Sequence, residues 1–155
     1  MKFSVREDIE APIEFVFAQM TDFKALERAA MRRGAEVQRV DTNTQVGPGM
    51  AWDASFKLRG RQRDVQIEIT ELDTPNRLVL SSRSPAMGGK MVVELIALSR
   101  ARTRAIMDVD LQPKNLSAKL LVQSMRLARK NLNKRLKDRV KGYAEEIASK
   151  YRRAS

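Results

Sequence analysis

The side chains that most often carry out chemistry in proteins are missing from this sequence. Its 155 residues include no histidine and no cysteine. This excludes Ser-His-Asp triads, cysteine nucleophiles, disulfides and thiolate metal sites. An acid–base pair would have to come from Asp, Glu, Lys, Arg or Tyr. Many of the acidic residues fall at outward strand positions, for example Asp64, Glu68, Asp108 and Asp110, where a solvated charge is the ordinary explanation. We therefore assign no catalytic residue.

Glu7 is the exception among the acidic residues. Strict alternation over 2–10 predicts a half-buried strand, and it places Glu7 on the same face as Phe3, Val5 and Ile9. A carboxylate on that face is either a functional group or the partner of a nearby arginine. The sequence leaves both alternatives open.

The elements that must position such residues follow a simple order. After the first strand, Pro12 opens a short helix over 13–20, and Asp22 caps a second over 23–33 that Gly34 ends. Period-two patterns separated by turn residues then predict six strands, at 35–42, 49–58, 61–72, 77–84, 90–98 and 103–112. No linker or internal repeat divides the chain, so we expect one α+β domain over 1–155.

The last quarter of the chain predicts one long helix over 115–151. Apolar residues recur there every three or four positions, including Leu121, Met125, Leu132 and Ile147. Because a helix cannot bury such a stripe against itself, the strands must supply the opposing surface. The opposite face is basic and carries Lys119, Arg126, Arg129, Lys130, Lys134, Lys137 and Lys141.

The net positive charge of the protein is concentrated on that basic surface. The net charge is +11, with 12 Lys and Arg against 3 Asp and Glu in residues 115–155, and 18 against 16 in residues 1–114. The surface either is a solvated helix face or docks an anionic partner: a membrane surface, RNA or an acidic protein. The charged N-terminal residues are unlike a signal peptide, so we expect a cytoplasmic protein.

Three local segments stand out: residues 9–17 followed by Thr21-Asp22-Phe23, residues 46–52 and residues 69–78. They resemble the START-like (SRPBCC) superfamily, in particular its bacterial polyketide cyclase/dehydrase-like branch. The resemblance spans almost the whole chain and implies a helix-grip fold, in which a curved antiparallel sheet of about seven strands wraps around the long C-terminal helix. It also implies a cavity between sheet and helix that takes hydrophobic or amphipathic molecules such as lipids, quinones or polyketides.

The inward rows of the strands and helix would line such a cavity. The expected lining residues are Trp52, Phe56, Ile67, Ile69, Leu80, Met91, Val93, Leu95, Met107, Leu121, Met125 and Leu132. Glu7, Arg83 and Tyr143 are candidates for a polar anchor at a cavity end. The alternative is that these side chains pack together and leave no void, because protein interiors approach crystal density.

Three functions fit the sequence. The leading hypothesis is binding or transport of a hydrophobic small molecule without a metal or tightly bound cofactor. The second is a cyclase or dehydratase acting on such a molecule, which buried paired polar groups would support. The third is an interaction protein that uses the basic helix surface.

Overall fold

The computed structural model describes all residues from Met1 to Ser155, and its strands form one antiparallel sheet in the order β1-β7-β6-β5-β4-β3-β2. Strand β1 therefore crosses over to pair with β7, while the other strands pair with their neighbours in sequence. The strands are β1 (Lys2–Ile9), β2 (Glu36–Arg39), β3 (Ala51–Leu58), β4 (Arg61–Asp73), β5 (Arg77–Arg83), β6 (Met87–Ser99) and β7 (Arg102–Pro113).

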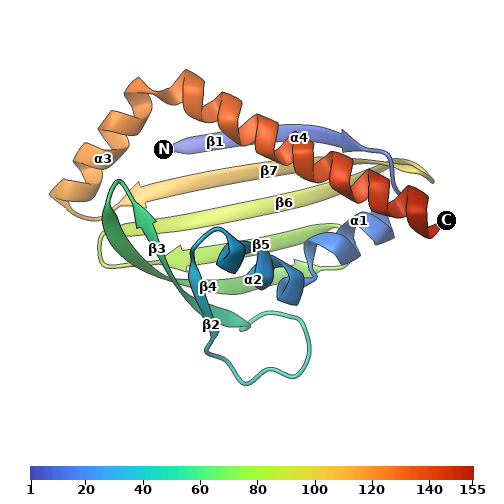
Figure 1. Cartoon of the computed structure of the whole chain (residues 1–155), viewed down its shortest axis with the longest axis horizontal. Helices are drawn as coiled ribbons and strands as arrows, with labels where there is room; N and C mark the ends of the chain where they lie inside the picture. Colours follow the sequence, from blue (N-terminus) through green and yellow to red (C-terminus); the bar gives the residue numbers. More distant parts are fainter.

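Two short helices and two C-terminal helices complete the fold (Figure 1). Helix α1 (Ile13–Met20) begins directly after Pro12, and the Asp22 carboxylate caps α2 (Phe23–Arg32) by accepting a hydrogen bond from the Ala25 N–H. The C-terminal helices are α3 (Leu116–Leu127) and α4 (Arg129–Ala154). The predicted α+β architecture, with two short helices after the first strand and a long helix at the end, is confirmed.

The predicted single helix over 115–151 is wrong in one respect, because the chain leaves helical geometry at Ala128. This residue has φ −99° and ψ 17°, and it ends α3 and precedes α4. Figure 1 shows the two helices meeting at a corner above the sheet. A straight helix of that length, about 50 Å, would leave one end off a curved sheet. The break lets α3 bury Ala118 and Val122 while α4 buries Ala144, Ile147 and Ala148.

The fully buried core is concentrated at one end of the sheet. There α1 and the C-terminal half of α4 pack on the inward residues of the strands, including Ile9, Ile69, Leu78 and Leu95. Thr103 is the one buried polar residue, and its hydroxyl donates a 2.8 Å hydrogen bond to the Ala11 carbonyl. Beyond this end, the same inward rows continue across the middle of the sheet with less cover.

Candidate ligand-binding site

The inward residues in the middle of the sheet are only half-buried. The pairing register places Ile67, Leu80, Met91, Val93 and Met107 on the same face as the core residues Ile69, Leu78 and Leu95. All five are nevertheless partly exposed, whereas Ile69 is 0% exposed. Apolar side chains on the helix-covered face of a sheet are normally packed to high density. Their partial exposure shows that the space in front of them is not filled.

Two apolar cavities occupy this space. The inner cavity, of about 190 Å³, lies between the sheet and α4 and is lined by apolar residues and Tyr143. The edge cavity, of about 310 Å³, is a depression open to solvent between α2 and strands β2 to β5. Phe23, Leu26 and Leu80 line both, so the two cavities adjoin at these three side chains.

Most of the predicted lining residues meet in these cavities. Leu80, Met91, Val93 and Met107 line the inner cavity. Trp52, Phe56 and Ile67 line the edge cavity together with Leu80. Ile69 and Leu95 are instead fully packed at the core end. Leu121, Met125 and Leu132 line neither cavity, because the break at Ala128 redirects α3 and because α4 contributes Val140, Tyr143, Ala144 and Ile147 from its later turns.

Trp52 forms a fixed wall of the edge cavity. It is 5% exposed, its ring lies 5.1 Å from that of Phe23, and its Nε1–H donates a 2.6 Å hydrogen bond to Glu27 Oε1. The Arg39 guanidinium also lies over the Trp52 ring, 5.9 Å from its centroid. Glu27 is the one charged residue among those that line the edge cavity. The sequence reasoning missed Glu27, although its position four residues after Phe23 places it on the same face of α2.

Arg39 is itself held in place by Asp41. The Asp41 carboxylate accepts hydrogen bonds from Arg39 Nε and Nη2 at 2.6 and 2.7 Å, and from the backbone N–H groups of Ala51 and Asn43 at 2.9 and 2.8 Å. The Arg39 hydrogen bonds, followed by those from Ala51 and Asn43, hold the pKa of Asp41 well below its usual range. The ionised carboxylate thus fixes the loop that leads into β3.

We therefore expect Asp41 to make stability depend on pH. A carboxylate whose pKa is lower in the folded state contributes stability above its unfolded pKa, near 4, and loses it as the pH falls toward the folded value. The variant Asp41→Asn should be less stable than the parent protein at pH 7, and the difference should shrink below about pH 4. Urea unfolding at several pH values measures this difference. A gap that stays constant with pH would contradict the assignment.

The three predicted polar anchors end up in different places. Glu7 lies on the inward face, half-buried and directly opposite Ala105, which lines the inner cavity, and its side chain makes no hydrogen bond or ion pair. Tyr143 also lines the inner cavity, and its hydroxyl donates a 3.3 Å hydrogen bond to the Gln19 carbonyl. Burial, followed by the charges of Glu146 and Asp22, raises the pKa of Tyr143 above its ordinary value.

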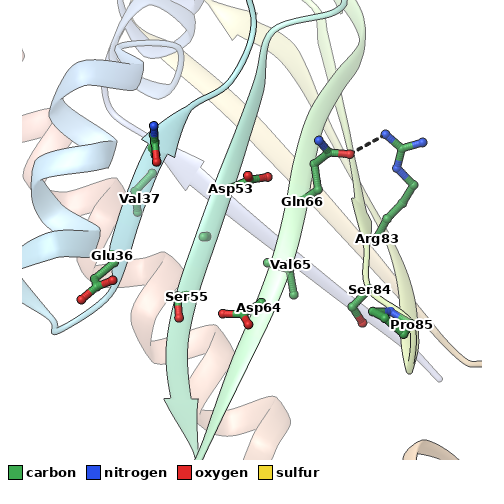
Figure 2. A pocket seen from close by; sticks show the side chains of 12 residues that line it. Glu36, Val37, Asp53, Ser55, Asp64, Val65, Gln66, Arg83, Ser84 and Pro85 are labelled. Atoms are coloured by element: carbon green, nitrogen blue, oxygen red, sulfur yellow. Dashed lines mark hydrogen bonds between the residues drawn. The ribbon is translucent and has the colours of Figure 1, made fainter.

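The expectation for Arg83 needs correction. It lies on the outer face of the sheet, in an open groove lined by residues of β2 to β5, where its Nη2 donates a 2.7 Å hydrogen bond to Gln66 (Figure 2). The reason is the alternation of β5, in which Leu78, Leu80 and Ser82 face inward and Arg83 therefore faces outward. The carboxylates in this groove, from Glu36, Asp53 and Asp64, belong to exposed residues.

Sequence reasoning missed one further polar residue on the inward face, Arg63. Arg63 lies directly opposite Phe56 in the β3–β4 pair, two residues before Val65, and both neighbours line the edge cavity. It is the one residue whose side chain has a buried nitrogen, Nε, without a hydrogen-bond partner, and it forms no ion pair. Such orphaned donors are uncommon in native structures. The period-two pattern of residues 61–69 was the available signal.

The basic surface of the C-terminal region is exposed, as expected from its residue types. All seven of its residues are solvent-exposed, but the break at Ala128 divides them between two helices. Arg129 has a structural contact, because its Nη2 donates a 2.7 Å hydrogen bond to the Lys2 carbonyl and its guanidinium lies over the Phe3 ring. No helix in the structure combines the length and the apolar character that a bilayer crossing requires.

Comparisons of sequence alone place the chain in no group, since no family model and no curated protein matches it. Comparison of structures does find similar folds. Protein TTHA0849 from Thermus thermophilus matches with a TM-score of 0.70 and 16% identity over 96% of this chain and 98% of its own. The Zhui aromatase/cyclase from Streptomyces sp. R1128 matches with a TM-score of 0.66 and 14% identity, over 94% and 93% of the two chains.

A START superfamily protein from Mycobacterium smegmatis has a TM-score of 0.58 and 12% identity, with 88% of this chain and 97% of that one covered. At these identities the likeness concerns the fold, and it extends over nearly the full length of each chain. The seven-stranded sheet, the paired short helices and the long C-terminal helix all agree with it. The chain therefore has a START-like, helix-grip fold.

Proposed function

We propose that this protein binds an amphipathic small molecule, of the lipid, quinone or polyketide class, in the adjoining inner and edge cavities. The observation that carries the proposal is the unfilled apolar space in front of the half-buried inward row from Ile67 to Met107. The edge cavity of about 310 Å³ reaches the range of ligand pockets, which begins at about 300 Å³. Methionines 91 and 107 add adaptable walls.

The fold neighbours are consistent with this proposal. One neighbour is described as an aromatase/cyclase and another as a START superfamily protein. A fold is shared by many functions, so the proposal depends on the site itself. Transport or storage fits this site better than catalysis, because the Tyr143 hydroxyl donates a hydrogen bond to a backbone carbonyl and Glu27 already accepts one from Trp52. The lining thus offers no free acid–base pair.

Arg63 is our candidate for holding the polar end of the ligand. It lies on the inward face opposite Phe56, which lines the edge cavity, and it has no carboxylate partner. Guanidinium groups form two parallel hydrogen bonds with carboxylates and phosphates. We therefore place an anionic head group at Arg63 and the apolar body of the ligand against Trp52, Phe56 and Leu80.

Filling the junction of the two cavities should weaken ligand binding strongly. Leu80 lines both cavities, so Leu80→Trp places an indole where the ligand would lie. Titration with the neutral fluorophore N-phenyl-1-naphthylamine should show saturable binding to the parent protein, and at least about tenfold weaker binding to this variant. Because the ring enters empty space, the stability loss should fall below the roughly 1–3 kcal/mol typical of overpacked cores.

Leu98→Trp is the matched control, since Leu98 is 42% exposed and lines neither cavity. It should bind the fluorophore as the parent protein does. Absence of saturable binding to the parent protein, or equal binding by both variants, would contradict the proposal. Native mass spectrometry of protein purified gently from its own host would then name the chemical class of the ligand.

A further inference from the structure

The outer side of α3 carries an exposed row of leucines. Leu116, Leu120 and Leu127 are 72%, 56% and 93% exposed, and we call these three residues the leucine row. Their spacing of four and seven residues places them on one stripe of a helix with 3.6 residues per turn. Exposed apolar groups that are aligned in this way mark interaction surfaces more often than scattered ones do.

The leucine row is not a displaced part of the core. Helix α3 already buries its opposite side through Ala118 and Val122, and its connection to the body is completed by the hydrogen bond from Arg59 to Ser124. The break at Ala128 separates α3 from α4, so that α3 forms a corner of the molecule (Figure 1). The leucines therefore face away from the protein at a position that a large flat partner can reach.

The chain segment that contains the row carries only positive charges. Residues 111–137 contain eight Lys and Arg and no Asp or Glu. On α3 itself, Lys119 and Arg126 flank the row, are exposed and form no ion pair. A helix that combines aliphatic and basic side chains in this way is typical of segments that lie in the interface of an anionic membrane.

We propose that α3 docks this protein on an anionic lipid surface, with the leucine row inserted among the acyl chains and the flanking basic residues at the head groups. This inference is independent of the ligand cavity, because no residue of α3 lines the inner or the edge cavity. Docking on an anionic lipid surface accounts for both the exposed leucines and the basic residues of α3.

Other partners account for the leucine row or for the positive charge, but not for both. A second copy of the chain would oppose its own basic residues across the contact, where like charges repel. RNA would meet the positive charge, but single-stranded recognition depends on aromatic stacking platforms, and α3 contains no aromatic residue. A lipid surface is the partner that gains from three aliphatic side chains and from lysine and arginine together.

Co-sedimentation with vesicles tests the proposal on the full chain. The parent protein should bind vesicles of phosphatidylglycerol and phosphatidylcholine, bind pure phosphatidylcholine at least about tenfold more weakly, and lose binding as salt is raised. The triple variant L116Q/L120Q/L127Q should bind the mixed vesicles at least about tenfold more weakly. The charge variant K119E/R126E should show a comparable loss.

Two matched controls separate docking from general surface effects. I96Q/L98Q removes two exposed apolar side chains from β6, and K24E/R28E makes the same charge change on exposed residues of α2. Both should bind vesicles as the parent protein does, and circular dichroism should show that all four variants are folded.

Four outcomes would overturn the proposal. One is unchanged vesicle binding by the triple variant. Another is a loss that the control variants share equally. The third is a parent protein whose self-association, measured by sedimentation, is abolished by the triple variant while vesicles stay unbound. If the parent protein binds an RNA oligonucleotide and not the vesicles, the membrane assignment is likewise wrong.

Discussion

Replacing Ile69 by alanine should destabilise this protein several times more than the same truncation of its cross-strand partner, Leu80. The two side chains lie directly opposite each other in the β4–β5 pair, on the same face of the sheet. Ile69 is 0% exposed within the core, whereas Leu80 is half-buried and lines both cavities. The comparison therefore tests where packing ends and open space begins.

The expected sizes follow from what each truncation leaves behind. Ile69→Ala creates a new cavity in close-packed surroundings and should cost about 2–5 kcal/mol of the free energy of unfolding. Leu80→Ala widens a space that already exists. Because Leu80 is only half-buried, the truncation gives up less buried apolar area, and its cost should be about 1 kcal/mol. Urea denaturation of both variants, with the linear extrapolation to water, gives the two values.

Leu98→Ala serves as the control for the substitution itself, because Leu98 is 42% exposed. It should change stability by no more than about 0.5 kcal/mol. Equal losses for Ile69→Ala and Leu80→Ala would mean that the middle of the sheet is as tightly packed as the core, and the proposed ligand site would then be closed.

The second large effect concerns Arg63. If its guanidinium holds an anionic head group, Arg63→Met should weaken binding of lauric acid by about 10- to 100-fold, the range expected for a lost hydrogen bond to a charged group. Methyl laurate carries no charge, so its affinity should be nearly unchanged. Displacement of N-phenyl-1-naphthylamine measures both ligands in the same assay.

Arg63→Met should not lose stability in the absence of ligand, although its affinity for lauric acid falls. Arg63 Nε is buried without a hydrogen-bond partner, which costs free energy in the folded state. Methionine removes this group and keeps an apolar stem, so Arg63→Met should be at least as stable as the parent protein. Arg61→Met is the matched control, because Arg61 is two residues away on the same strand and is exposed. Equal loss of acid and ester affinity in Arg63→Met would contradict the anchoring role.

Much of the fold follows from local patterns in the sequence. The bounds of α1 are those expected from Pro12 and the apolar residues after it, and α2 begins after its Asp22 cap as predicted. The inward placement of Trp52, Leu80 and Met91 follows from strict alternation, because successive side chains in a strand point to opposite faces. The same rule, applied to β4 and β5, would have placed Arg63 inward and Arg83 outward.

Other features depend on contacts between distant parts of the chain. Nothing in the residues around Ala128 indicates a helix end, since alanine and leucine are strong helix formers. The break arises because a straight helix cannot follow a curved sheet, which only the assembled strands define. Gly142, the one glycine in residues 115–155, lies within the unbroken α4.

The sequence by itself determined which residues face inward, because strand alternation and helix spacing are properties of the local backbone. It did not determine whether those residues meet. Ile69 and Leu80 are similar in size and hydrophobicity and lie on the same face, yet the first is packed and the second lines open space. The difference comes from where α1, α2 and α4 cross the sheet, and cavity volume is a property of that tertiary arrangement.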